Sequence, residues 1–146
     1  MKILAIDPGL RCTGIAIYND TQWTVESVRV EEHDLAVRVR TIAACIRILC
    51  PSCDLLVIER PQVYQGRLQK GDPNDLIDLS VLVGALLSIP HVKALLPRPR
   101  EWKGQTPKDI HHKRIRELLP NLGPVSKDAM DAVGLAIWGW DHAETM

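Results

Sequence analysis

The sequence has no phenylalanine, no net charge and no apolar run of the ~18 residues that a membrane-spanning helix needs. The absence of such runs excludes a membrane protein, and 46% hydrophobic with 25% charged residues are the proportions of an ordinary globular domain. Strand-forming residues begin within two positions of Met1 and leave no room for a signal peptide. We therefore expect one domain over residues 1–146, located in the cytoplasm and without membrane contact.

Two of the four cysteines, Cys50 and Cys53, have the spacing of zinc ligands. No second Cys-x-x-Cys pair and no His-x-x-x-His pair accompanies them, so a tetrahedral site would lack half of its ligands. Without an export signal, disulfide bonds are not expected either. The pattern favours free thiols in a turn and leaves zinc binding open.

The zero net charge conceals an uneven distribution. Between Lys93 and Arg116, eight lysine and arginine residues stand against only Glu101 and Asp109, so this segment carries a formal charge of +6. Screening confines each charge to about 10 Å at moderate salt, and a local basic surface can therefore bind phosphates whatever the global sum. The segment indicates a nucleic-acid contact, with a solvated loop and helix face as the alternative.

Hydrophobic periodicity predicts strands and helices in the order β-β-β-α-β-α-β-α-α. The strands are expected at residues 2–7, 14–18, 23–30, 55–58 and 92–96, and the helices at 34–49, 75–87, 106–119 and from 126 onward. Asp34 and Ser126 are good N-caps for the helices that follow them. Pro97, Pro99 and Pro107 predict an irregular segment after the last strand. This order predicts an α/β fold with a mixed sheet between helices.

Four acidic residues lie where such a fold would bring them together. Asp7 and Glu59 each follow a short continuous apolar run, the pattern of a central strand buried on both faces. In neighbouring parallel strands they would lie side by side at one edge of the sheet. Asp128 and Asp131 are three residues apart and therefore share one face of the last helix. If that face packs on the strand ends, the four carboxylates converge.

Converging carboxylates need protons or cations. Two like charges about 4 Å apart repel by roughly 4 kcal/mol at an effective dielectric of about 20, and oxygen ligands favour Mg²⁺ or Mn²⁺ over zinc. The pattern predicts a phosphodiesterase with two ions per site, in which Asp7 bridges the ions, Glu59 and Asp128 each complete one coordination sphere, and Asp131 binds or orients. Taken singly, Asp7 could be only a turn former before Pro8, and Asp128 only a helix-start residue.

Three parts of the sequence carry a resemblance to a known family. They are Ile6-Asp7-Pro8-Gly9 with Thr13-Gly14, then Val57-Ile58-Glu59 with Gln62-Val63-Tyr64, and Lys127-Asp128-Ala129-Met130-Asp131-Ala132. In this order they resemble the RuvC-type Holliday junction resolvases of the ribonuclease H-like superfamily, and residues 98–105 look more like the members carried by bacteriophages. The resemblance spans nearly the whole chain. It implies a ribonuclease H-like fold with a five-stranded mixed sheet flanked by helices, and an endonuclease that cuts phosphodiester bonds in Holliday junctions or other branched DNA.

The resemblance also implies individual roles. The catalytic and metal-binding carboxylates map onto Asp7, Glu59, Asp128 and Asp131, with Mg²⁺ or Mn²⁺ as the cofactor. A two-fold homodimer is implied too, because a four-way junction must be cut on two opposed strands. We expect the apolar helix at residues 76–87 to form the dimer interface, with core packing as the alternative.

Eleven residues are expected to contact DNA: Arg60, Tyr64, Arg67, Lys70, Arg98, Arg100, Trp102, Lys103, Lys108, His112 and Lys113. By resemblance, Tyr64 lies near an aromatic residue that the family uses to wedge open the junction. Trp102 would stack on an unpaired base or pack in the core. His111 and His112 are expected to contact phosphates or to be exposed, rather than to act as general base or metal ligand. Lys127 could offset transition-state charge or be an exposed lysine at a helix start.

Three other functions fit parts of the sequence. Arg11 after Asp-x-Gly suggests a YqgF-like ribonuclease acting on RNA, although the surroundings of Glu59, Asp128 and Asp131 fit the resolvase better. A sugar-kinase or actin-type ATPase also begins with Asp-x-Gly, but 146 residues cannot hold its two duplicated domains, and no nucleotide cofactor is expected. A non-catalytic module that binds branched DNA would gain nothing from carboxylates facing phosphates.

Overall fold

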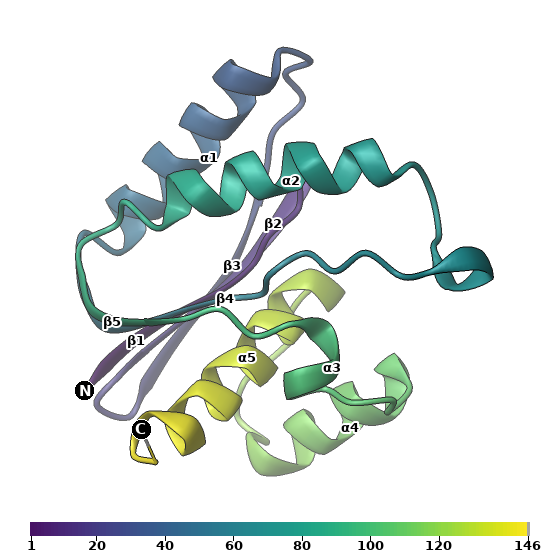
Figure 1. Ribbon diagram of the computed structural model, residues 1–146. Helices are drawn as coiled ribbons and strands as arrows, with labels where there is room; N and C mark the ends of the chain where they lie inside the picture. Colours follow the sequence, from purple (N-terminus) through teal and green to yellow (C-terminus); the bar gives the residue numbers. More distant parts are fainter. Residues whose placement is uncertain (146) are drawn as a thin grey trace.

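The computed structural model describes residues 1–145 and contains a five-stranded sheet in the order β3-β2-β1-β4-β5 (Figure 1). The strands are β1 (Lys2–Asp7), β2 (Cys12–Asn19), β3 (Gln22–Arg29), β4 (Cys53–Ile58) and β5 (His91–Leu95). β1, β2 and β3 pair antiparallel, whereas β1, β4 and β5 pair parallel. The predicted mixed sheet is therefore confirmed.

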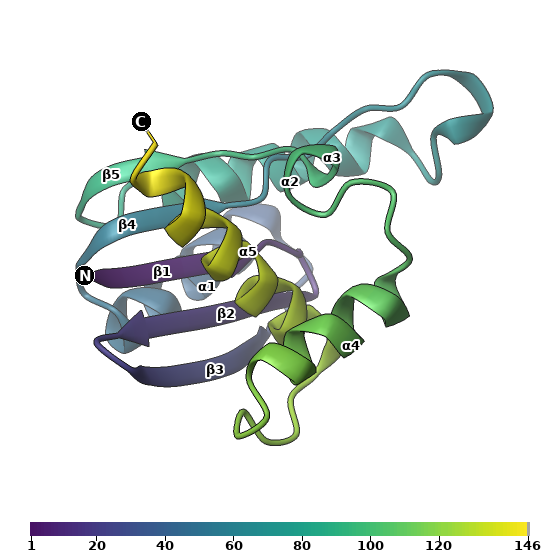
Figure 2. The same cartoon turned by 90° about the horizontal axis from the view of Figure 1, so that it is seen from below.

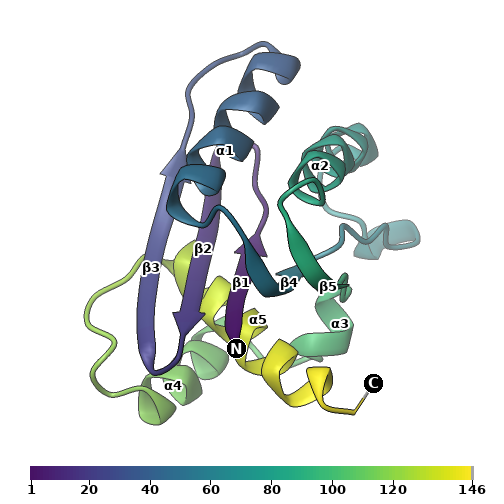
Figure 3. The same cartoon turned by 90° about the vertical axis from the view of Figure 1, so that its left-hand side faces the viewer.

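Helices cover both faces of this sheet. They are α1 (Leu35–Leu49), α2 (Pro73–Leu86), α3 (Pro99–Trp102), α4 (Lys108–Leu118) and α5 (Lys127–Ala143), and a 3-10 turn spans Gly66–Leu68. α1 and α2 lie over one face, and α5 lies on the other with α3 and α4 beside it (Figures 1 and 3). Across the described residues, no helix combines the length and apolar character needed to cross a membrane.

The central strand β1 contributes to a core on each face of the sheet. Leu4 and Ile6 pack with residues of α1 and α2, while Ile3 and Ala5 pack with residues of α5. All four side chains are at most 1% exposed. Burial on both faces explains the continuous apolar run, because neither face of this strand meets water. β1 is therefore held from both sides, and so is its last residue, Asp7.

Side-chain caps set the starts of the long helices. Asp34 and Ser126 accept hydrogen bonds of 2.9 and 3.2 Å from backbone N–H groups three residues further on, so both predicted N-caps are confirmed. α2 begins two residues before the predicted start. Asp72 caps it, and Pro73, whose φ is already suited to a helix, lies in its first turn.

The prediction of an irregular segment between β5 and α4 is wrong in part. Pro99–Trp102 form a single helical turn. Proline is tolerated at the first helical position, where its missing N–H would have no partner in the helix. Glu101 also accepts a hydrogen bond from the backbone N–H of Arg98. The turn places Trp102 against Gly134 of α5.

The cysteine pair lies near the start of β4, at the opposite end of this strand from Ile58. Cys50 follows α1, Cys53 begins β4, and all four cysteines are free thiols. No group of three or more His, Cys, Asp or Glu side chains among residues 1–145 is placed to hold a metal ion. Cys50 and Cys53 thus lie on either side of the short connection from α1 to β4, and zinc binding by the pair stays open.

Candidate active site

Asp7 and Glu59 come together because β1 and β4 are neighbouring parallel strands. Ile6 lies opposite Ile58, and the backbone N–H of Glu59 donates to the carbonyl oxygen of Ile6 at 3.2 Å. Asp7 is the next residue after Ile6. Both carboxylates therefore leave the same edge of the sheet, as predicted from the two strand ends.

The start of α5 meets this edge from one face of the sheet (Figure 2). Gly14 of β2 pairs with Asp7, and a Cβ added to Gly14 would lie 2.0 Å from the carbonyl oxygen of Asp128. A residue without a side chain is needed for so close an approach. Asp131, one helical turn further on, is 3% exposed. Gly14 thus allows the helix to bring both aspartates to the strand ends.

The acid groups of the site interact electrostatically. Burial raises the pKa of Asp7 well above its usual value, and the negative charges of Glu59, Asp131 and Asp128 raise it further against the opposing charge of Lys103. Burial also raises the pKa of Glu59, although the charge of Lys103 opposes this shift. The acid groups therefore resist simultaneous ionisation, which a bound cation would relieve.

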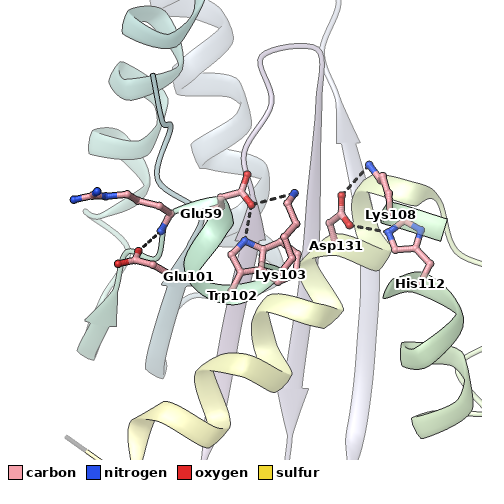
Figure 4. A network of polar contacts seen from close by, with 8 residues as sticks. Glu59, Glu101, Trp102, Lys103, Lys108, His112 and Asp131 are labelled. Atoms are coloured by element: carbon pink, nitrogen blue, oxygen red, sulfur yellow. Dashed lines mark hydrogen bonds and ion pairs between the residues drawn. The ribbon is translucent and has the colours of Figure 1, made fainter. Parts of the chain in front are cut away.

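Glu59 is held by α3 and by the residue after it (Figure 4). The Nε1–H group of Trp102 donates to Oε2 of Glu59 at 2.6 Å, and Nζ of Lys103 lies 3.6 Å from the same oxygen. The side chain of Glu59 is only 17% exposed, and a buried carboxylate needs such donors. Both contacts use one oxygen of the carboxylate.

Asp131 is held by α4 (Figure 4). Nζ of Lys108 lies 2.8 Å from Oδ2, and Nε2 of His112 lies 2.7 Å from Oδ1. Burial alone would raise the pKa of Asp131, but the hydrogen bonds from Lys108 and His112 outweigh it, and the pKa is lowered. Asp131 is therefore ionised at neutral pH with both oxygens engaged.

The donor set fits a hard divalent cation. The acid groups offer oxygen ligands, which suit Mg²⁺ or Mn²⁺, and a bound cation would oppose the rise that burial and the neighbouring acid groups cause in the pKa of Asp7. The carboxylates of Glu59 and Asp131 also accept from nitrogen donors. Within residues 1–145, no three acid, His or Cys side chains are already grouped to hold an ion. Because a carboxylate has about four acceptor sites, Glu59 and Asp131 keep sites for a cation in the orientation observed.

Known proteins resemble this chain along almost its whole length. No family model matches it. The crossover junction endodeoxyribonuclease RuvC of Herminiimonas arsenicoxydans is 31% identical over 150 residues, which cover 94% of this chain and 82% of the relative. The chain belongs to the RuvC family. The RuvC protein of Burkholderia multivorans is 29% identical over 147 residues with the same coverage.

Solved structures of RuvC proteins share the fold. The structure of Thermus thermophilus RuvC in complex with a Holliday junction substrate matches with a TM-score of 0.73, covering 99% of this chain and 96% of that one. A second structure of Thermus thermophilus RuvC matches with a TM-score of 0.71. Sequence identity is 17% in both cases, so this likeness shows the fold. The predicted ribonuclease H-like fold is confirmed.

In this RuvC-family fold, one set of the predicted DNA contacts lies at the surface. Its exposed members are Arg60, Arg67, Lys70, Arg98, Arg100 and Lys113. Arg67 and Lys70 belong to the arm, residues 60–72, which extends beyond the sheet (Figures 1 and 2). The guanidinium carbon of Arg100 lies 5.3 Å from the centre of the Tyr64 ring. The arm and α3 therefore present these two side chains together.

The other set turns toward the carboxylates. Trp102 is 8% exposed, which favours its packing in the core over a stack on an unpaired base. The side chain of His112 is 15% exposed and binds Asp131 instead of facing a phosphate. His111 is half-buried, with its ring centre 5.2 Å from that of Trp102. The expectation that these histidines are exposed is therefore wrong, because α4 packs this part of its surface on α5, and a phosphate contact stays a prediction.

The lysines beside the carboxylates of this RuvC-family chain are Lys103 and Lys108. Lys127 is exposed as the first residue of α5, which favours its interpretation as a helix-start lysine. One sequence signal pointed to the contacts of Asp131: Lys108 and His112 are four residues apart and share a face of α4. Which carboxylate that face meets depends on how α4 docks, and spacing alone does not reveal this.

Proposed function

We propose that this protein is a metal-dependent endonuclease that cleaves phosphodiester bonds in Holliday junctions or other branched DNA, as a single domain over residues 1–146. One observation supports the proposal: in this chain of the RuvC family, Asp7 and Glu59 leave neighbouring strand ends, and the charges of Glu59, Asp131 and Asp128 raise the pKa of the buried Asp7. We propose Asp7, Glu59, Asp128 and Asp131 as the catalytic carboxylates.

Asp7, Glu59 and Asp128 are proposed to hold two Mg²⁺ or Mn²⁺ ions. Bound ions supply the positive charge and the activated water that phosphodiester hydrolysis needs. Their charge also favours the ionised forms of Asp7 and Glu59, whose pKa values are raised without it. Asp131 is ionised, and its oxygens keep lone pairs beyond those that Lys108 and His112 engage, so we propose that it binds an ion or orients the ligands beside it.

The two site lysines are proposed to change partners when DNA binds. In the free protein, Lys103 lies 3.6 Å from Glu59 and Lys108 lies 2.8 Å from Asp131, where their charges offset the carboxylates. A phosphate entering the site carries negative charge that these ammonium groups can meet by charge-assisted hydrogen bonds. Lys103 and Lys108 would then steady the negative charge that develops on the reacting phosphate.

The surface around the site is proposed to bind the DNA backbone. The exposed basic residues Arg60, Arg98 and Lys113 supply phosphate contacts, and the arm adds Arg67 and Lys70. The Tyr64 ring, paired with Arg100, offers an apolar surface beside these charges. We propose that this ring wedges into the junction, where a base can stack on an aromatic face.

We propose that α2 forms the interface of a two-fold homodimer. The helix buries Leu82, Val83 and Leu86 in the core, yet leaves Ile77 and Val81 62% and 49% exposed. The two exposed residues are four apart, so they form one apolar stripe on the helix. Core packing, the alternative for this helix, explains only its inner face.

Val81→Glu is expected to turn the dimer into monomers, because the substitution places an unpaired charge in an apolar contact. Sedimentation equilibrium gives the mass of each form. Ile48→Glu on α1 is the matched control, since Ile48 is 80% exposed and should tolerate the charge without a change in mass. A monomeric wild type, or a Val81→Glu variant that remains dimeric, would rule out this interface.

Cleavage of labelled substrates tests the proposed function. Four-way junctions, flaps, linear duplex and RNA are incubated with the protein in Mg²⁺, Mn²⁺ or EDTA, and the products are separated on denaturing gels. We expect cleavage of branched DNA that depends on the divalent ion. Cleavage confined to RNA would favour the YqgF-like ribonuclease, and junction binding without cleavage under any condition would favour a non-catalytic module.

A further inference from the structure

Two ring N–H groups hold two of the acid side chains of the proposed active site. Nε1 of Trp102 donates to Oε2 of Glu59 at 2.6 Å, and Nε2 of His112 lies 2.7 Å from Oδ1 of Asp131. Because an ionised carboxylate only accepts hydrogen bonds, Nε2 of His112 carries the hydrogen in this contact. One residue of α3 and one of α4 thus each hold one oxygen of a carboxylate (Figure 4).

Little water reaches these two hydrogen bonds. The side chains of Glu59 and Asp131 are 17% and 5% exposed, and that of His112 is 15% exposed. Trp102 is 8% exposed. Water seldom competes for a hydrogen bond in such surroundings, and a carboxylate that lost its donor would turn toward another partner. The two bonds therefore restrict the orientation of each carboxylate more than they would at the surface.

A shared contact on α5 places the rings of Trp102 and His111. A Cβ added to Gly134 would lie 2.8 Å from the Trp102 ring and 2.7 Å from the His111 ring, so both pack directly on the helix backbone. The two rings also meet edge-on, with 5.2 Å between their centres. His111 directly precedes His112 in α4, and its docking therefore sets the position of His112 as well.

We propose that Trp102 and His112 are positioning residues, which hold Glu59 and Asp131 in the orientation that divalent-ion binding needs. The inference rests on the proposed endonuclease function, which assigns these carboxylates to its active site. Lys103 and Lys108 touch the same carboxylates, but a compact ammonium on a flexible stem supplies charge with little directional restraint. The rigid rings supply the direction.

Trp102→Phe and His112→Phe test the two bonds, because each substitution keeps an aromatic ring and removes the N–H donor. Loss of a hydrogen bond to a metal-binding carboxylate typically lowers metal affinity by 10- to 100-fold, so we expect the Mn²⁺ dissociation constant to rise by about 10-fold in each variant. Calorimetric titration without DNA measures this constant. His112→Gln keeps a donor and should recover most of the affinity.

Trp140→Phe is the matched control. It makes the same substitution near the other end of α5, at a tryptophan that is 38% exposed, and should bind Mn²⁺ like the wild type. The indole N–H resonance of Trp102 in metal-free, nitrogen-15-labelled protein gives a second measurement. Glu59→Gln replaces the carboxylate acceptor with a weaker carboxamide acceptor, so this resonance should move upfield.

Each outcome decides between the two proposals. Unchanged Mn²⁺ affinity in both phenylalanine variants would overturn the positioning role, and so would an affinity loss in His112→Gln as large as in His112→Phe. If Trp102→Phe fails to fold, an indole resonance that does not respond to Glu59→Gln would overturn the role of Trp102. If His112→Phe fails to fold, unimpaired Mn²⁺ binding by a folded His112→Ala variant would overturn the role of His112. A wild type that binds Mn²⁺ with the expected variant effects but cuts no DNA would overturn only the endonuclease function. A wild type that binds no Mn²⁺ would overturn both.

Discussion

Asp7→Asn is expected to abolish junction cleavage while raising the melting temperature of the metal-free protein at neutral pH. Removing one group that supports transition-state charge typically costs about 10²- to 10³-fold, and Asp7 is one of the carboxylates that would hold the ions. Asparagine has nearly the same shape but carries no charge into the field of Glu59, Asp131 and Asp128. Activity and stability should therefore change in opposite directions, which marks a carboxylate retained for function.

The pH dependence of stability follows from the same groups. The pKa values of Asp7 and Glu59 are raised in the folded state, so each stabilises the fold below its unfolded pKa of about 4 and loses this contribution as the pH rises through its folded value. The contribution of Asp131 to folding stability depends on pH in the opposite way. Its pKa is lowered, so Asp131 stabilises the fold at neutral pH and loses this effect only as the pH falls below about 4. Thermal unfolding in EDTA between pH 4 and 8 should show falling stability for the wild type and a flatter profile for Asp7→Asn.

Asp141→Asn is the control for this substitution. Asp141 is an exposed aspartate on α5, the helix that carries Asp128, so cleavage and the pH profile should both match the wild type. If Asp7→Asn still cleaves junctions at the wild-type rate, Asp7 has no catalytic role. If the variant melts at a lower temperature than the wild type at neutral pH, Asp7 stabilises the fold, and the electrostatic explanation fails.

Gly14→Ala is expected to damage both the fold and the site. The new methyl group would lie 2.0 Å from the carbonyl oxygen of Asp128 and 2.8 Å from the backbone nitrogen of Ala129, so α5 must move away from β2. Overpacking of this kind typically costs about 1–3 kcal/mol of stability. A shift of about 1 Å in a catalytic group can reduce the rate by about 10²-fold, so cleavage should fall even in the folded fraction.

Denaturant unfolding and single-turnover cleavage measure the two effects of Gly14→Ala. Gly84→Ala adds the same methyl group to α2, where no atom of another element lies within 4 Å, and should leave cleavage unchanged once its dimer mass is verified. A Gly14→Ala variant with wild-type cleavage would show that the closeness of α5 to β2 is not needed to place Asp128.

The sequence predicted the frame of the fold because its signals are local. β1 has a continuous apolar run since Ile3 and Leu4 face two different cores, and such a run is visible without knowing what covers it. Asp34 and Ser126 cap their helices through bonds that span three residues. The turn at Pro99–Trp102 was missed, because three prolines suggested a break where one of them occupies the first position of a helix.

The proposed site was predictable only in part. The positions of Asp7 and Glu59 follow from two strand ends, which a parallel pair places at one edge. The partners of Glu59 were not predictable, because the bond from Trp102 exists only when α3 docks beside Gly134 on α5. Trp102 and Glu59 are 43 residues apart in the sequence, and no spacing rule connects them.

Anomalous X-ray scattering from crystals grown with Mn²⁺ tests most directly whether the acid residues form one ion site. We expect anomalous peaks between the carboxylates of Asp7, Glu59 and Asp128, with Asp131 alongside. Peaks only elsewhere on the surface, or no peak at an Mn²⁺ concentration that supports cleavage, would contradict the central claim that these carboxylates form a divalent-ion site.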